Sequence, residues 1–345
     1  MARVRSGNTV TLRDVARLAN VHPGTVSRAL NAETRALVNP ETAQRVLQAA
    51  EQLGYRPNPI ARGLKTNRSY TIGVLIPDLT NPLFPPIARG IEDRLDEDGY
   101  TPLIASTDND PERERVDFET MRARQVDGFI TATARADHDL LDDIAAAGLP
   151  IVLVNRRLID GGLPAVSVDD AEGMRIAVAH VVDLGHRRIA HIAGSQRLST
   201  GHYRLHGFLE AMREHRLEPD PDLVVFSDAF TEEEGARLAR ELLDRDPRPT
   251  AIIAANDLLA LGCFDALRER GLSCPGDVSV IGFNDMRFAD RFDPPLTTVR
   301  LPHYDMGVAA ATLLLERLGD ADAPVRQILL PPALVVRGST GRPAG

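Results

Sequence analysis

The chain has 345 residues, of which 43% are hydrophobic and 26% charged, proportions typical of folded domains in water. Its length allows two or three domains, and its formal net charge is −9 at pH 7. The sequence shows neither a run of transmembrane length nor signal-peptide grammar, so we expect a cytoplasmic protein without a membrane partner. Cys263 and Cys274, the two cysteines, lack CxxC or metal-binding spacing and should be reduced.

Charge is distributed unevenly along the chain. Residues 1–68 carry eleven basic and four acidic side chains, a net charge of +7, whereas the remaining residues carry −16. A basic module on an acidic body is expected when only one end of a protein must approach phosphate groups. Chance clustering of charge is the alternative that composition alone leaves open.

Residues 10–31, VTLRDVARLANVHPGTVSRALN, predict two short helices joined by a tight turn. Thr11 and Asp14 form a capping-box pattern at the start of the first helix. Pro23 suits the first position of the second helix, where its missing N–H costs nothing. A third helix is expected over residues 40–53, and the three should share one small core.

A shorter helical segment is predicted in PNPIARGL, residues 57–64. Asn58 is a suitable N-cap and Pro59 a suitable first residue. One or two turns weakened by Gly63 should not be stable alone in water. We therefore expect this segment to need a partner to become helical.

From residue 70 onward, short β-rich apolar runs alternate with helical stretches. Nine expected strands lie within residues 70–77, 99–107, 126–133, 149–155, 164–169, 187–194, 222–228, 250–257 and 277–285. This alternation predicts an α/β fold with parallel sheets covered by helices on both faces. Nine strands exceed one comfortable sheet, so we expect two doubly wound lobes. Ligands should bind beyond the carboxyl ends of the strands, in the cleft between the lobes.

The chain closely resembles the lactose-repressor-type (LacI/GalR) transcription factors from residue 10 to about residue 340. The resemblance is carried by TLRDVARLANVHPGTVSRALN, VNPETAQRVLQAAEQLGYRPNPIARGLKT, IPDLTNPLF, VDGFI, VNR, LGHRRIAHIAG, AANDLLALG, VSVIGFND and PPLTTVRLP. It implies an N-terminal three-helix helix-turn-helix headpiece and a two-lobed, doubly wound, periplasmic-binding-protein-like (type I) body.

On this resemblance the headpiece would span residues 1–57 and the hinge helix and linker residues 58–69. The body would span residues 70–340. Lobe 1 would contain about residues 70–168 and 303–330, and lobe 2 about residues 169–302 and 331–340.

The resemblance also implies that the second helix lies in the major groove of DNA. Arg28 is the strongest candidate for a base contact, because arginine can donate two hydrogen bonds to guanine; a solvated surface arginine is the alternative. Unlike the family, this helix opens with Pro23 and Gly24, which offer no side-chain donor or acceptor. The other predicted DNA contacts are Thr11, His22, Thr25, Ser27, Asn31, Tyr55, Asn58 and Arg62.

Leu64 matches the leucine that the family's hinge helix inserts into the minor groove at the operator centre, where it unstacks a base step and bends the duplex. A plain linker whose Leu64 packs on the body is the alternative.

The family's effector contacts correspond, position by position, to Leu83, Phe84, Asn155, Arg156, Thr200, Arg204, Phe230, Asn256 and Asn284. The family usually has aspartate where Asn284 stands, and frequently where Asn155 stands. At these two positions, carboxylates that would accept hydrogen bonds from sugar hydroxyls are replaced by amides, whereas the arginines Arg156 and Arg204 remain. A less hydroxylated or anionic ligand is one hypothesis, unless Asp257 or Asp285 neutralises an arginine; a neutral sugar held by amides is the alternative.

Enzyme and metal chemistry receive little support from the sequence. Lys65, the only lysine, lies in the hinge, and no P-loop, GxSxG, HExxH or GxGxxG pattern occurs. Spacings of six and five place no two of His180, His186 and His191 on one face. We expect no catalytic residue, cofactor or metal.

The sequence therefore predicts a repressor that binds a palindromic double-stranded DNA operator as a homodimer. A sugar or related metabolite in the interlobe cleft would control it. A solute-binding sensor without specific DNA recognition is the alternative, which the basic headpiece disfavours. Because the chain ends straight after its last strand, a dimer is favoured over a tetramer.

Overall fold

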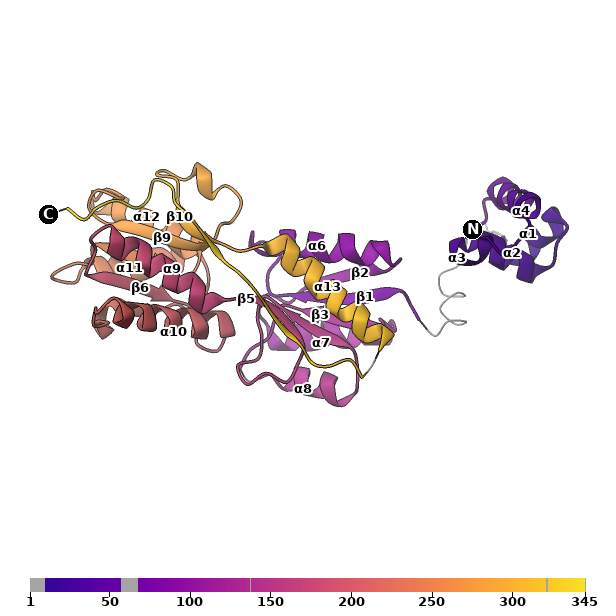
Figure 1. The fold of residues 1–345 in the computed structure, drawn as a ribbon, viewed down its shortest axis with the longest axis horizontal. Helices are drawn as coiled ribbons and strands as arrows, with labels where there is room; N and C mark the ends of the chain where they lie inside the picture. The colour runs from indigo at the N-terminus through magenta and orange to yellow at the C-terminus, as the bar shows by residue number, and fades with distance from the viewer. Residues whose placement is uncertain (1–9, 57–67, 137, 321, 345) are drawn as a thin grey trace, which may run out of the picture. The chain divides into compact units, whose positions relative to one another are not determined.

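The computed structural model describes residues 10–56, 68–136, 138–320 and 322–344. The chain divides into two compact units, Met1–Ser69 and Tyr70–Gly345, each of which is described by itself (Figure 1). Within the ranges just given, no helix combines the length and the apolar composition needed to cross a membrane.

The first unit is helical. Its elements are α1 (Leu12–Ala19), α2 (Pro23–Leu30), α3 (Ala32–Arg35) and α4 (Pro40–Leu53). Val15, Val26 and Val46, one from each of the three longer helices, are fully buried in a shared core. The Asp14 carboxylate accepts hydrogen bonds from the amide and hydroxyl of Thr11 at 2.9 and 2.6 Å, so the cap predicted at the start of α1 is confirmed.

The three-helix prediction for this unit lacked α3, a single helical turn between α2 and α4. Side chains of this turn hold it against the end of α2. The Thr34 hydroxyl donates to the Arg28 carbonyl at 3.0 Å, and Arg35 Nε donates to the Ala29 carbonyl at 2.9 Å. So short a helix has too little intrinsic stability to leave a periodic pattern in the sequence.

The second unit contains two six-stranded sheets (Figure 1). The first has the order β11-β5-β4-β3-β1-β2 and is parallel throughout. Its strands are β1 (Thr71–Ile76), β2 (Thr101–Ser106), β3 (Gly128–Thr131), β4 (Ile151–Val154), β5 (Ala165–Val168) and β11 (Gln327–Leu330). One face is covered by α6 (Phe84–Glu97) and α13 (His303–Gly319), the other by α7 (Pro111–Ala123) and α8 (Asp139–Ala146).

The second sheet has the order β12-β10-β9-β8-β6-β7. Its strands are β6 (Ile189–Ala193), β7 (Val224–Phe226), β8 (Ala251–Ala254), β9 (Ser279–Asn284), β10 (Thr297–Arg300) and β12 (Ala333–Val335). One face packs on α9 (Asp170–Asp183) and α10 (Ser199–Glu214), the other on α11 (Glu232–Leu243) and α12 (Asp257–Glu269). The expected α/β fold with two doubly wound sheets is confirmed, although β12 joins β10 in antiparallel orientation.

All nine expected strands occur, and the described residues contain three more, β10, β11 and β12. The chain passes between the sheets after β5, after β10 and between β11 and β12. Two sheets joined in this way direct the carboxyl ends of their parallel strands toward a common region, where such folds bind ligands.

Close helix packing in the first sheet's outer layer depends on two glycines. A Cβ atom at Gly90 of α6 would lie 2.1 Å from the Tyr304 carbonyl oxygen of α13, and one at Gly307 would lie 2.1 Å from the Ile87 carbonyl oxygen. Because the obstacle is backbone in both cases, only glycine permits this approach of α6 and α13.

Candidate functional site

The nine predicted effector contacts come together around one cavity of about 420 Å³ in the second unit. Leu83, Phe84, Asn155 and Arg156 reach it from the first sheet, and Thr200, Arg204, Phe230, Asn256 and Asn284 from the second. A volume of this order is typical of small-molecule sites, which span about 300–1,000 Å³. Apolar, amide and guanidinium groups in one enclosure can hold a small polar ligand.

Two of the lining amides lie where strands end. Asn155 follows β4 with φ 64°, and Asn284 closes β9 with φ 121°. Positive φ is uncommon outside glycine, and asparagine tolerates it better than most residues. Asn284 Oδ1 is buried and has no hydrogen-bond partner within the described chain, so it is an acceptor available to a ligand. Asn256 Oδ1, by contrast, caps α12 by accepting from the Leu259 amide at 2.9 Å.

Arg204 is held by groups of the protein itself. Its Nε lies 2.7 Å from Asp170 Oδ1, its Nη1 donates to the Ala255 carbonyl at 2.5 Å, and its guanidinium stacks 3.9 Å from the Phe283 ring centroid. Burial raises the pKa of Asp170, and the Arg204 charge opposes that rise. Arg204 therefore enters the cavity as one half of a buried ion pair.

Arg156 differs from Arg204 in having no such partner. It is 6% exposed, and within the described ranges its guanidinium makes neither an ion pair nor a hydrogen bond. Burial, followed by the repulsion of Arg135 and Arg204, lowers its pKa to about 10, while Glu114 opposes the change. The side chain is thus positively charged at neutral pH.

Sequence reasoning missed Arg135, which lines the cavity, and Glu114 and Asp170, which lie behind it. Arg135 Nη1 lies 3.0 Å from the buried Glu114 carboxylate, which also accepts a hydrogen bond from the Thr133 hydroxyl. Their place in the chain could have indicated Arg135 and Asp170, because each lies a few residues after the carboxyl end of a strand, Arg135 after β3 and Asp170 after β5. Glu114, inside α7, had no such signal.

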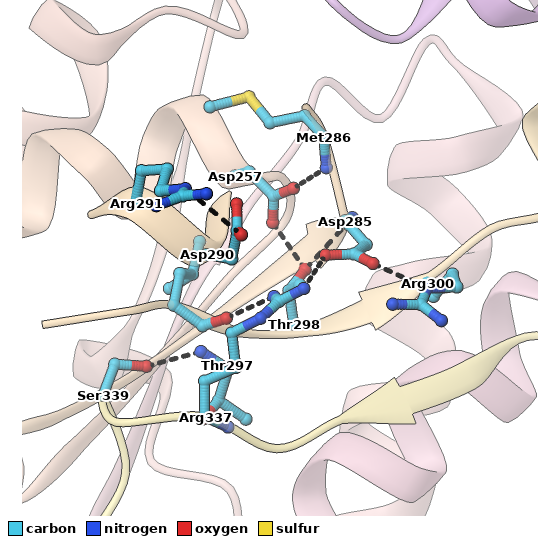
Figure 2. Close-up of polar contacts among 11 residues, drawn as sticks. Asp257, Asp285, Met286, Asp290, Arg291, Thr297, Thr298, Arg300, Arg337 and Ser339 are labelled. Atoms are coloured by element: carbon cyan, nitrogen blue, oxygen red, sulfur yellow. Dashed lines mark hydrogen bonds and ion pairs between the residues drawn. The ribbon is translucent and has the colours of Figure 1, made fainter. Parts of the chain in front are cut away.

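Asp257 does not neutralise a cavity arginine, contrary to one alternative raised by the sequence. Its carboxylate accepts hydrogen bonds from the Met286 amide at 2.7 Å and the Thr298 hydroxyl at 2.5 Å (Figure 2). These bonds connect the start of α12 to β10 and to the loop after β9.

Asp285 also lies outside the cavity lining. It pairs with Arg300 Nε and Arg337 Nη2, each at 2.6 Å (Figure 2). It therefore ties the end of β9 to the last residue of β10 and to the segment after β12. The alternative that Asp257 or Asp285 offsets Arg156 or Arg204 was wrong, because a closer buried carboxylate, Asp170, pairs with Arg204.

Asp257 predicts a pH-dependent stability. Burial raises its pKa to about 7, whereas an unfolded aspartate titrates near about 3.9. The folded state therefore binds the extra proton between these values, so stability falls as the pH rises from about 4 to about 7. We expect Asp257→Asn to remove up to about 4 kcal/mol of this pH dependence. Urea unfolding from pH 4 to pH 8 measures it.

The exposed Asp96→Asn on α6 is the matched control for this experiment, because the same chemical change there meets water. Parallel profiles for Asp257→Asn and the unmodified chain would show that Asp257 does not govern this window.

The three histidines that lie close together in the sequence each make hydrogen bonds to different partners. His180 Nε2 lies 2.9 Å from Thr340 Oγ1, His186 bonds Thr250 and the Gly341 carbonyl, and His191 Nδ1 lies 2.8 Å from the Ile253 carbonyl. In the described part of the chain no three potential ligands gather for a metal ion.

The first unit presents α2 with Arg28 exposed in its last turn. No described residue pairs with the Arg28 guanidinium. Thr25 and Ser27 are half-buried on the same helix, and Asn31 is its C-cap. His22 Nδ1 accepts the Gly24 amide at 3.0 Å, so it caps the helix, a role that the sequence interpretation missed.

The remaining predicted DNA contacts divide into two groups. Thr11 is the exposed N-cap of α1, and Tyr55 packs half-buried on the helical core. Asn58, Arg62 and Leu64 lie outside the described residues, so their predicted roles stay predictions.

Comparison with known proteins connects both units to one group. The pattern described as "Bacterial regulatory proteins, lacI family" matches residues 11–58, and "Periplasmic binding protein-like domain" matches residues 178–340. The HTH-type transcriptional repressor CytR of Escherichia coli (strain K12) is 34% identical over 340 residues, covering 99% of each chain.

Two solved structures extend this likeness. The lac repressor dimer bound to operator and the anti-inducer ONPF matches with a TM-score of 0.85 at 28% identity, covering 97% of this chain and 100% of that one. The transcriptional regulator CelR in complex with cellobiose matches with a TM-score of 0.74 at 33% identity, covering 96% and 99%.

Proposed function

Because the chain belongs to the lacI family of bacterial regulatory proteins, we propose that it represses transcription by binding a palindromic DNA operator as a dimer. A small molecule in the cavity controls that binding. The observation that carries this proposal is the presence, in one chain, of two units: a helix-turn-helix unit with an exposed Arg28 that pairs with no described residue, and a two-sheet unit with a ligand-sized cavity. Like its relatives, the chain is a transcriptional regulator and not an enzyme.

DNA recognition rests on the first unit. The N-terminal part of α2 lies in the major groove, and α1 crosses the phosphate backbone. Arg28 donates to a guanine edge, while Thr25 and Ser27 contact phosphates. Two units in a dimer read the two halves of the operator. Because its target is chromosomal DNA, the protein acts in the cytoplasm.

Ligand binding is coupled to the angle between the two sheets. Asn284 lines the cavity, and the next residue, Asp285, ties the end of β9 to Arg300 at the end of β10 and to Arg337 just after β12. The chain crosses between the sheets directly after β10 and directly before β12. A ligand that contacts both sheets favours one angle between them. Coupling of this kind typically changes affinity at the second site by about 1–3 kcal/mol. The solved relative CelR, with cellobiose bound, supports a sugar or related metabolite as the effector.

A selection from random DNA duplexes tests the proposed function. Purified full-length protein is mixed with the pool at about 0.15 M salt, because phosphate attraction alone imitates recognition at low salt. We expect enrichment of a palindrome, with the flexible pyrimidine–purine step at its centre that the Leu64 prediction requires. The selection is repeated with pooled sugars and nucleosides as co-repressors. No enrichment in either case would leave a sensor without specific DNA recognition.

A further inference from the structure

One buried charge of the cavity, the Arg156 guanidinium, has no carboxylate partner among the described residues, and this identifies a chemical class of ligand. We propose that the effector carries an anionic group, a carboxylate or a phosphate, which the Arg156 guanidinium binds. This inference rests on the proposed function, because it names the effector class of the same site.

Most of the buried arginines at the cavity already have a carboxylate partner. Three arginines that are buried or nearly so line the cavity, and two have a carboxylate partner: Arg135 pairs with Glu114 at 3.0 Å, and Arg204 with Asp170 at 2.7 Å. Arg156 is 6% exposed and has no ion pair among the described residues. A buried charge without a partner is unfavourable, so the site is more stable when a ligand supplies the opposite charge.

The carboxylates at the mouth of the cavity do not fill this role. Asp108 is exposed and pairs with Arg113, Asp78 accepts from the Thr80 amide and hydroxyl, and Asp228 is exposed. No ion pair joins any of the three to Arg156 in the described chain. The exposed Arg197 also lines the mouth and adds a further positive charge.

Two amide side chains that share the cavity with Arg156 also favour an anion. Asn155 precedes it in the chain, and Asn284 faces the same cavity from the other sheet. An aspartate at either position would place a negative charge in the cavity and compete with an anionic ligand. Because Asn284 Oδ1 is buried and unpartnered, the ligand also supplies a hydroxyl or N–H donor. An anionic sugar derivative combines both groups.

The experiment measures thermal unfolding of the full-length protein with simple anions and with matched ligand pairs. Inorganic phosphate and acetate are titrated against chloride at equal ionic strength. Glucose 6-phosphate and gluconate are compared with glucose, and ribose 5-phosphate with ribose. We expect saturable stabilisation by an anion and a preference for the charged member of a pair. The phosphate and carboxylate arms separate the two sources of charge.

Arg156→Gln and Arg157→Gln form the decisive pair of variants. Arg157 does not line the cavity, because its guanidinium stacks 4.0 Å from the Tyr203 ring centroid. Loss of a charged hydrogen bond weakens binding by roughly 10- to 150-fold, so Arg156→Gln should weaken anion binding by at least about tenfold. Arg157→Gln should change it by less than about twofold. Without anions, Arg156→Gln should unfold at the same or a higher temperature, because it removes an uncompensated charge.

Asn155→Asp keeps the proposal testable if Arg156→Gln does not fold. The added carboxylate should weaken anion binding at least as strongly as Arg156→Gln. Anion effects that are absent, or equal in the unmodified chain, Arg156→Gln and Asn155→Asp, would overturn the proposal, as would stronger binding of the neutral members. The duplex selection is independent: an enriched operator without an Arg156-dependent anion effect removes the anionic effector and leaves the repressor function standing.

Discussion

Replacing Arg204 with alanine is expected to cost about 3–5 kcal/mol of unfolding free energy at pH 7, because it leaves the buried Asp170 carboxylate without its partner. Both side chains are about 4% exposed, and their ion pair measures 2.7 Å. The Ala255 carbonyl also loses its guanidinium donor. Urea unfolding of the purified full-length variant measures the cost.

The pH dependence of this cost identifies its source. The pKa of Asp170 is already raised by burial, with Arg204 opposing the rise, so Arg204→Ala should raise it further. When the folded-state pKa of an aspartate is raised, the unfolding free energy of the protein falls as the pH rises above the unfolded-state pKa of about 3.9. The difference between variant and unmodified chain should therefore be largest at neutral pH and shrink toward about pH 4.

Arg240→Ala is the matched control, since it removes an arginine whose ion pair is exposed. Arg240 contacts Glu269 through two hydrogen bonds of 2.7 and 2.8 Å, but the two side chains are 41% and 51% exposed. Exposed pairs contribute about 0–1 kcal/mol. A cost for Arg204→Ala as small as for Arg240→Ala, or one that does not vary with pH, would show that the pair is not the source.

The strands that sequence reasoning found and missed differ in their side chains. Most of the nine predicted strands are predominantly apolar, such as IVLV in β4, whose four residues are all buried. β10 reads TTVR, and its polar threonines resemble a loop until Thr298 is seen to bond Asp257 and Thr297 to bond Thr340. β11 and β12 are edge strands with exposed positions, so burial leaves them little pattern. The edge strands β2 and β7 are exposed too, but their place between helical stretches identified them.

The residues of the candidate site also divide into some that the sequence could predict and some that it could not. The residues after the strands could be predicted to converge, because parallel strands direct their carboxyl ends to one edge of the sheet. The resemblance to a known family then selected among them. The partners behind the cavity could not be predicted: Glu114 and Arg135 are 21 residues apart, and Asp170 and Arg204 are 34 apart. Such pairings depend on tertiary packing, which no local periodicity records.

Replacing Arg28 with alanine is expected to lower affinity for the selected operator by about 1–3 kcal/mol, roughly 5- to 150-fold. The reason is the composition of α2: Pro23 and Gly24 at its start carry no side-chain donor, and His22 uses Nδ1 to cap the helix. Arg28, exposed and unpaired among the described residues, is left as the side chain able to make a bidentate contact. Fluorescence anisotropy with a labelled operator at about 0.15 M salt measures the loss.

The pattern of that loss distinguishes a base contact from a phosphate contact. A base contact predicts that Arg28→Ala relaxes preference at one base pair in each half-site, which a repeated duplex selection would show. A phosphate contact predicts equal weakening on every duplex and a salt dependence whose slope falls by about 1. Arg45→Ala, at an exposed position on α4, is the control and should leave sequence preference unchanged. Uniform weakening by Arg28→Ala would therefore show that other residues of α2, or the hinge, make the base contacts.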